Sequence, residues 1–255
     1  MRLSIDVALN STLSAHDAAL LMVDVVSGDG QVVVTSDLAV DQGTLTRVGD
    51  TGMVWARVPG TALALRYRAE IDITRRATGL EGLQASPPET LLAEVLPYLR
   101  PSRYCPSDMF ADFTAQQFGT LAGGAKIAAI RDWVAGNLSY IPGSSNGTTT
   151  AAETFCTRQG VCRDFTHMLC TLARAAQIPS RYASAYGAEV APQDFHAIAQ
   201  VWLEGAWHPV DATNMGAPHE MAVIATGRDA ADVAFMETAH WAQLDFLRVA
   251  VSRGA

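Results

Sequence analysis

The sequence predicts an α+β protein in which an all-β, sandwich-like domain, residues 1–80, precedes a mixed domain, residues 81–255. Two observations support this division. Apolar and polar residues alternate with a period of two in the first third of the chain, and helical spacing of three and four residues replaces that pattern after residue 120. Proline-rich stretches lie between the two patterns, so we place the boundary between residues 75 and 90.

Strand patterns fill the N-terminal domain. From Leu63 to Ile73 every second residue is apolar, which is typical of a strand with one buried face. The apolar stretches 19–26 and 32–34 flank Ser27-Gly-Asp-Gly30, which predicts a hairpin. Gly49-Asp-Thr-Gly52 separates two further short strands. Because no helical period occurs here, we expect an antiparallel, sandwich-like module.

Two helices are predicted in the mixed domain. Apolar residues at helical spacing indicate one helix over residues 124–138. A second helix is expected over residues 161–177, where Ile178-Pro179 ends it. The composition of residues 143–150 is that of a loop.

The charge balance excludes some classes of partner. The formal net charge is -8, which disfavours nucleic acid and anionic membranes as main partners. No stretch approaches the roughly 18 apolar residues of a membrane span, and the first ten residues alternate like a strand and unlike a signal peptide. We therefore expect a cytoplasmic protein with four reduced cysteines and no membrane partner. The sequence indicates no particular oligomeric state.

Cys162 lies at the predicted start of the second helix. The positive end of a helix and its free backbone N–H groups favour a thiolate and can hold an oxyanion. A buried cysteine that only fills space is the alternative interpretation. A zinc site is disfavoured because no pair has the short C-x₂₋₄-C spacing; its ligands would be Cys156, Cys162, His167 and Cys170.

A hairpin over residues 196–213 supplies a base and an acid. If Leu203 faces Ala206 across a two-residue turn, His196 and Asp211 become diagonal neighbours on one face of the sheet. Diagonal neighbours are close enough for an imidazole and a carboxylate to meet. We therefore predict a hydrogen bond between these two side chains.

The other histidines nearby fit less well. His208 falls on the opposite face of the hairpin, and His167 points away from Cys162 on the same helix. Cys162, His196 and Asp211 can thus act as nucleophile, base and orienting acid, the logic of a catalytic triad.

Four segments around these residues resemble motifs of bacterial transglutaminase-like proteins, many of which are described as cysteine proteases. The segments follow one another in the family's order: Gly160-Val-Cys-Arg-Asp-Phe-Thr-His167, Ile178-Pro-Ser-Arg-Tyr182, Asp194-Phe-His-Ala197 and Trp207-His-Pro-Val-Asp-Ala-Thr213. The resemblance covers most of residues 97–235.

The resemblance implies a papain/transglutaminase-like core, in which a helix carrying the cysteine packs on an antiparallel sheet. The family's catalytic positions fall on Cys162, His196 and Asp211. The implied reaction is acyl transfer from a peptide or isopeptide amide of a protein substrate, through a thioester, without metal or organic cofactor. Water as acceptor gives hydrolysis and an amine gives cross-linking, and we expect hydrolysis.

The second oxyanion donor and the activity itself are left open by the sequence. Trp133, Asn137 and Tyr140, around the end of the preceding helix, are candidate donors beside the cysteine N–H. A catalytically silent binding module and a deglycosylating amidase are the alternative functions. A reactive thiol would distinguish an enzyme from the silent module.

Overall fold

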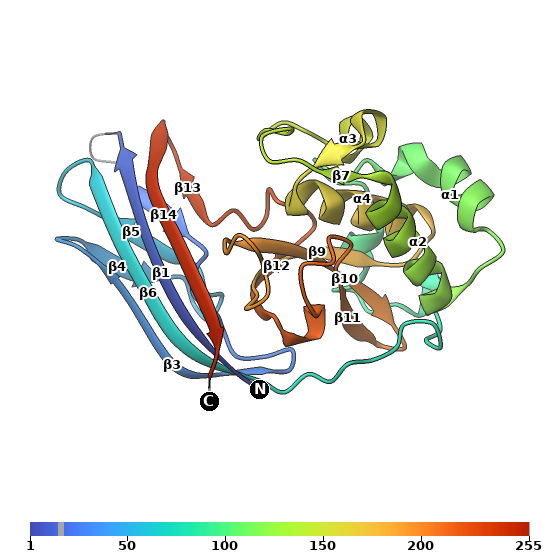
Figure 1. Cartoon of the computed structure of the whole chain (residues 1–255), viewed down its shortest axis with the longest axis horizontal. Coiled ribbons are helices and arrows are strands. Elements are labelled where there is room, and N and C mark those ends of the chain that lie inside the picture. The colour runs from blue at the N-terminus through green and yellow to red at the C-terminus, as the bar shows by residue number, and fades with distance from the viewer. Residues whose placement is uncertain (15–17, 255) are drawn as a thin grey trace.

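The computed structural model describes residues 1–14 and 18–254. A β-sandwich lies beside a mixed layer of helices and strands, and the two chain ends meet at the base of the sandwich (Figure 1). There the Gly254 N–H donates a hydrogen bond of 2.9 Å to the Arg2 carbonyl.

Two four-stranded antiparallel sheets form the sandwich. The first has the order β14 (Ala242–Arg253), β1 (Arg2–Leu13), β6 (Ala62–Ile73) and β3 (Gln31–Val40). The second has the order β13 (Met236–Thr238), β2 (Ala18–Leu21), β5 (Val54–Arg57) and β4 (Thr44–Arg47). The predicted period-two run is β6, and its apolar side chains face the sandwich core.

The C-terminal strands complete this sandwich. β14 pairs with β1 along its whole length, and β13 pairs with β2. Residues 236–253 therefore belong to the sandwich, whereas the division at residue 80 assigned them to the mixed domain. Local periodicity can indicate a strand, but it does not show that strands at the two ends of the chain pair with each other.

The hairpin predicted around residues 27–30 does not form. A tight turn is present, because Gly28 and Gln31 form an isolated bridge. However, β2 and β3 lie in different sheets. The apolar segment 22–26 crosses between the sheets, and the Val25 N–H donates to the Tyr67 hydroxyl at 3.0 Å. Met22, Val23 and Val25 are apolar because they are buried there, and the buried Asp24 carboxylate accepts a hydrogen bond from the Ser36 hydroxyl.

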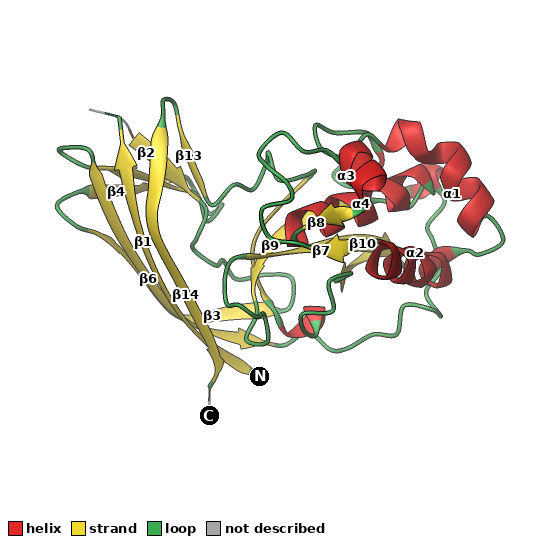
Figure 2. Ribbon diagram, turned by 45° about the horizontal axis from the view of Figure 1, so that its top comes forward, coloured by secondary structure: helices red, strands yellow, loops and turns green. Residues whose placement is uncertain are grey.

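The mixed layer has one antiparallel sheet with helices against it (Figure 2). The sheet order is β11 (Ala206–Val210), β10 (His196–Leu203), β9 (Ser180–Tyr186) and β12 (Ala222–Gly227). The helices are α1 (Ala111–Phe118), α2 (Gly123–Asn137), α3 (Ala151–Thr157) and α4 (Cys162–Ala175). A short parallel pair joins β7 (Ser139–Tyr140) to β8 (Gln159–Gly160). The two predicted helices are α2 and α4. Short 3₁₀ turns lie at Pro88–Thr90, Leu96–Leu99, Ser107–Phe110 and Pro218–Glu220.

Helix α4 is the centre of the mixed layer. Its buried residues Phe165 and Met168 share a core with Ala199 and Val201 of β10. The expected arrangement, a cysteine-bearing helix on an antiparallel sheet, is therefore confirmed. No helix in the described part of the chain is long and apolar enough to cross a membrane.

Candidate active site

Cys162 is the first residue of α4, and its thiol is free and partly exposed. Val161 before it is extended, and its N–H donates to the Asp164 carboxylate at 2.8 Å. The Cys162 N–H belongs to the first helical turn, whose donors have no acceptor within the helix. The start of α4 thus offers a thiol beside backbone donors.

Asp164, in the first turn of α4, holds several neighbouring groups in place. Its fully buried carboxylate also accepts a hydrogen bond of 2.5 Å from the Ser145 hydroxyl and pairs with the Arg163 guanidinium at 3.0 Å. Arg163 in turn donates to the Asn146 carbonyl at 2.5 Å. These bonds fix the loop 141–150 against the start of α4. The sequence carries no local signal for them, because Ser145 is 19 residues from Asp164.

The hairpin brings His196 to Asp211 as predicted. Leu203 faces Ala206 across a two-residue turn, which confirms the expected register. His196 Nε2 lies 2.8 Å from Asp211 Oδ2, and both side chains are almost fully buried. Thr213 donates to both oxygens of the carboxylate: its N–H to Oδ1 at 2.7 Å, and its hydroxyl to Oδ2, the oxygen that faces His196, at 2.9 Å. The carboxylate is therefore fixed in place before it orients the imidazole.

The environment of His196 favours an imidazolium. Burial disfavours the charged ring, but the Asp211 carboxylate and the neighbouring Cys162 thiol outweigh this effect and raise the pKa of His196 to about 9. Because Nε2 faces Asp211, Nδ1 is the nitrogen left to exchange a proton with Cys162. The structure thus brings Cys162, His196 and Asp211 together as a connected set.

Of the three candidate oxyanion donors, Tyr140 is the one that lies beside Cys162. The pairing of β7 with β8 sets Tyr140 opposite Gly160, two residues before the cysteine. Burial and the neighbouring Cys162 raise the pKa of the Tyr140 phenol to about 12, so it carries its proton at neutral pH. The phenol can therefore act as a donor at the cysteine.

Trp133 and Asn137 have other contacts. The Trp133 ring stacks on Phe155 with ring centroids 5.8 Å apart, and the Asn137 amide donates to the Trp133 carbonyl at 2.9 Å. The structure does not bring either side chain to Cys162.

The remaining cysteines and the histidines His167 and His208 have surroundings of their own. His167 is buried against the Tyr104 ring, and burial lowers its pKa to about 3. His208 lies 3.1 Å from the Leu203 carbonyl. Burial raises the pKa of Cys105 to about 12 and also raises that of Cys170, while Cys156 is exposed on α3. Within residues 1–14 and 18–254, no three His, Cys, Asp or Glu side chains could hold a metal ion together.

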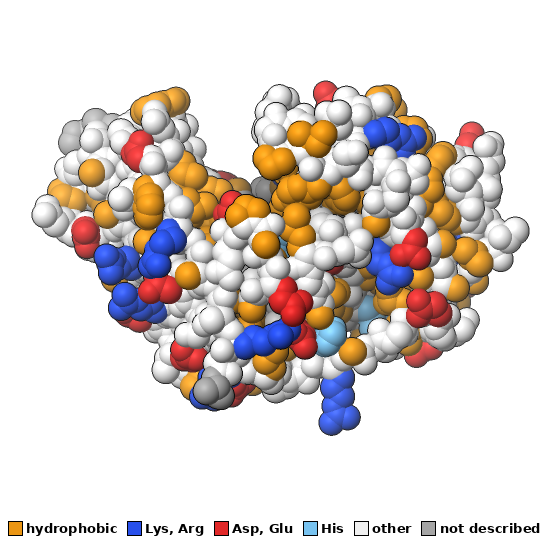
Figure 3. Space-filling view, in the orientation of Figure 1, with side chains coloured by type: hydrophobic (Ala, Val, Ile, Leu, Met, Phe, Trp, Pro, Cys, Tyr) orange, Lys and Arg blue, Asp and Glu red, His pale blue; other side chains and the backbone are white. Residues whose placement is uncertain are grey.

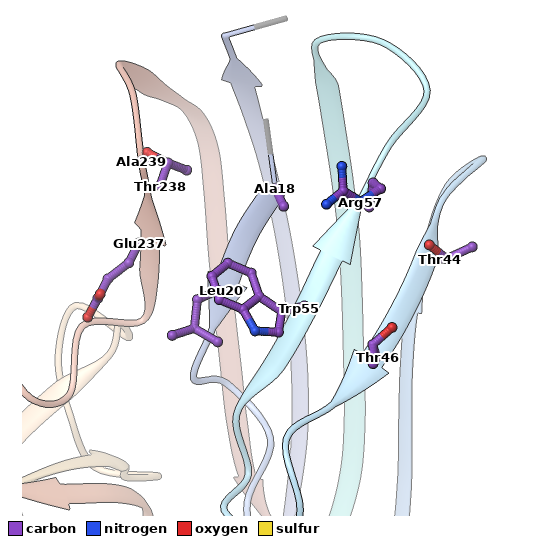
Figure 4. Close-up of a pocket in the computed structure, with 9 residues that line it drawn as sticks. All are labelled: Ala18, Leu20, Thr44, Thr46, Trp55, Arg57, Glu237, Thr238 and Ala239. Carbon is purple, nitrogen blue, oxygen red and sulfur yellow. The ribbon is translucent and has the colours of Figure 1, made fainter. Parts of the chain in front are cut away.

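A notch separates the sandwich from the mixed layer, with hydrophobic side chains on both walls (Figure 3). A separate cavity of about 710 Å³ lies on the second sheet of the sandwich, around Trp55, Arg57 and Glu237 (Figure 4). None of its described lining residues is a cysteine or a histidine.

The sequence of the mixed layer matches a known family. Residues 112–212, which include Cys162, His196 and Asp211, match the model of the transglutaminase-like superfamily. They form a transglutaminase-like core. An uncharacterized protein of Mycobacterium leprae (strain TN) is 31% identical over 119 residues. That match covers 43% of this chain and 42% of the relative, so the chain spans less than half of that protein's length.

Solved structures extend the likeness beyond the transglutaminase-like core. A Cytophaga hutchinsonii protein, provisionally described as a cysteine protease, superimposes with a TM-score of 0.91 at 29% identity. The match covers 99% of this chain and 90% of that chain, so it includes the sandwich. The periplasmic domain of TgpA from Pseudomonas aeruginosa matches with a TM-score of 0.42 at 19% identity, over 82% of this chain and 77% of that one.

Proposed function

We propose that the protein is a cysteine-dependent amide hydrolase or acyltransferase that acts on peptide or isopeptide amides of protein substrates. One observation carries the proposal: the His196 imidazole lies 2.8 Å from the Asp211 carboxylate, and Cys162, at the start of α4, is near enough to this ring to raise its pKa. This is the arrangement of a thiol nucleophile, its base and an orienting acid. The likeness to a protein described provisionally as a cysteine protease supports it.

Acylation begins with the Cys162 thiolate and the His196 imidazolium. The sulfur attacks the amide carbon, and negative charge develops on the carbonyl oxygen. The Cys162 N–H and the Tyr140 phenol donate to this oxygen, and the imidazolium passes its proton to the leaving amine. A thioester remains on Cys162, and the amine leaves. Asp211 keeps the imidazole oriented throughout.

Deacylation reverses these roles. Neutral His196 takes a proton from the acceptor, which attacks the thioester through the same oxyanion geometry and frees Cys162. Water as the acceptor gives hydrolysis, and a primary amine gives cross-linking. We propose hydrolysis as the main reaction, with the cytoplasm as its compartment.

Mass spectrometry of a peptide library incubated with the protein tests this function. We expect cleaved or deamidated peptides, a thioester adduct on intact wild-type protein, and neither with Cys162→Ala. Adding a primary amine distinguishes hydrolysis of the thioester from transfer of its acyl group, because transfer gives amine-linked peptides. A wild-type protein that forms no adduct and changes no peptide, at equal concentration and fold, would support the silent binding module instead.

A further inference from the structure

The loop that leads into His196 is attached to the sandwich by a side-chain amide. Gln193 lies in this loop, between β9 and β10. Its Nε2 donates to the Val251 carbonyl at 2.7 Å, and its Oε1 accepts from the Val251 N–H at 2.7 Å. β14 is an edge strand, so Val251 has no strand partner on this side. The Gln193 amide therefore pairs with the free edge of β14 as a neighbouring strand would, through two hydrogen bonds.

A second attachment holds the residue next to His196. The Phe195 ring stacks on Phe235, with ring centroids 5.0 Å apart and planes 10° apart. It also tilts against Tyr186, whose hydroxyl donates to the Val23 carbonyl at 2.9 Å. Phe195 thus packs against the sandwich core.

The backbone on the N-terminal side of His196 is therefore fixed by the sandwich at two points. On the C-terminal side, β10 fixes it through its pairing with β9 and β11. His196 therefore has a fixed neighbour on each side along the chain. A displacement of about 1 Å in such a group can cost a hundredfold in rate.

We propose that Gln193 is a positioning residue for His196, through which strand β14 of the sandwich sets the geometry of the Cys162–His196 pair. The proposal rests on the proposed function, because it gives the sandwich a part in the same reaction.

The test compares Gln193→Ala and Gln193→Glu with wild-type protein. The rate of Cys162 alkylation by iodoacetamide is measured from pH 5 to pH 9, and the His196 ring is titrated by NMR. Gln193→Ala should slow alkylation at pH 6 by about tenfold or more and lower the pKa of His196 from about 9. Gln193→Glu keeps the acceptor for the Val251 N–H and should retain part of the rate.

Glu189→Ala is the matched control. It breaks the 2.6 Å ion pair between Glu189 and Arg253, which joins the same loop to the same strand, but both side chains are about half exposed. Exposed ion pairs contribute little, so the alkylation profile should not change.

The outcomes separate this inference from the proposed function. A folded Gln193→Ala with the wild-type alkylation profile and His196 titration would overturn the positioning role; should that variant not fold, Gln193→Glu decides in the same way. Equal slowing by Glu189→Ala would also overturn it, because any loop anchor would then suffice. If wild-type Cys162 reacts no faster than a free thiol, the proposed function fails first.

Discussion

At the scale of single residues, the candidate site consists of the Cys162 thiol, the His196 imidazole and the Asp211 carboxylate, with the Tyr140 phenol near the thiol. Burial disfavours the charged form of the His196 ring, and the 2.8 Å contact with Asp211 favours it. Thr213 fixes the carboxylate, and Tyr140 lies close enough to Cys162 for its pKa to respond to the thiol. Each contact gives a separate expectation for a single substitution.

Replacing Asp211 by asparagine should lower the pKa of His196 from about 9 toward its ordinary value near 6.5. The amide keeps the shape but removes the charge that favours the imidazolium. Turnover should fall on the order of 10³–10⁴-fold, as when a triad acid is replaced in this way. NMR titration of the ring and amide-hydrolysis rates check the two effects.

Asp211→Asn should also change how the free energy of unfolding depends on pH. Because the folded pKa of His196 is raised above its unfolded value, the Asp211 bond stabilises the protein fully below about pH 6.5 and is lost as pH rises through about 9. Wild-type protein should therefore exceed Asp211→Asn in free energy of unfolding at pH 6, and the difference should shrink at pH 9.5. A difference that grows with pH in urea titrations would contradict this assignment.

Tyr140→Phe should separate chemistry at the oxyanion from reactivity of the thiol. Loss of one oxyanion donor lowers amide turnover by about 10²–10³-fold. Alkylation of Cys162 by iodoacetamide forms no oxyanion, so its rate should change little. Trp133→Phe is the control, since Trp133 packs on Phe155 and not on the cysteine. Equal loss in both assays would mean that Tyr140 acts on the thiol alone.

At the scale of elements, the start of α4 is the critical junction. Strand β8 ends at Gly160, two residues before Cys162, and Gly160 is packed closely against Asp164. A Cβ atom on Gly160 would lie 2.5 Å from the Asp164 Cβ, so only glycine fits before the helix. The bond from the Val161 N–H to Asp164 depends on this close approach.

Gly160→Ala should therefore destabilise the protein by about 1–3 kcal/mol, because the clash forces the helix start to move. It should also reduce the reactivity of Cys162. Gly136→Ala is the matched control: it lies inside α2 with no atom within 4 Å of the added Cβ. Alanine is the better helix former, so this variant should gain up to about 1 kcal/mol. Urea unfolding at pH 7 measures both.

At the scale of the whole molecule, the core of the sandwich extends into the mixed layer, which also has a core of its own around α4. Tyr186, Ala222 and Ile224 of the mixed-layer sheet lie within the sandwich cluster. Buried Gln31 of β3 joins the layers: its amide bonds both the N–H and the carbonyl of Val223, at 2.8 and 2.7 Å. We therefore expect the sandwich and the mixed layer to unfold together.

Gln31→Leu should lower the free energy of unfolding by about 2–3 kcal/mol, because it leaves buried partners at Val223 unpaired. Arg248→Ala, which breaks an exposed ion pair with Asp6, should cost less than about 1 kcal/mol. Far-UV circular dichroism and tryptophan fluorescence should report one coincident transition in wild-type protein. Two separated transitions would show that the sandwich and the mixed layer unfold independently of each other.

The sequence predicted the register of the hairpin that carries His196 and Asp211 better than it predicted the boundaries of the sandwich. Leu203 and Ala206 flank a two-residue turn with positive φ at Glu204 and Gly205, and such a turn fixes the register that joins His196 to Asp211. The place of β14 depends on pairing across the whole chain, which has no local pattern. Tyr140 could not be separated from Trp133 because two-residue strands such as β7 and β8 are too short to show a period.

The central claim is that Cys162 is a nucleophile activated by His196. Labelling with limiting iodoacetamide at pH 6, followed by peptide mapping, tests it most directly. Cys162 should react first, His196→Ala should slow that reaction sharply, and Cys170→Ala should leave it unchanged, because Cys170 is buried. Labelling of Cys105 or Cys156 at least as fast as Cys162, or the absence of any cysteine faster than a free thiol, would contradict the account.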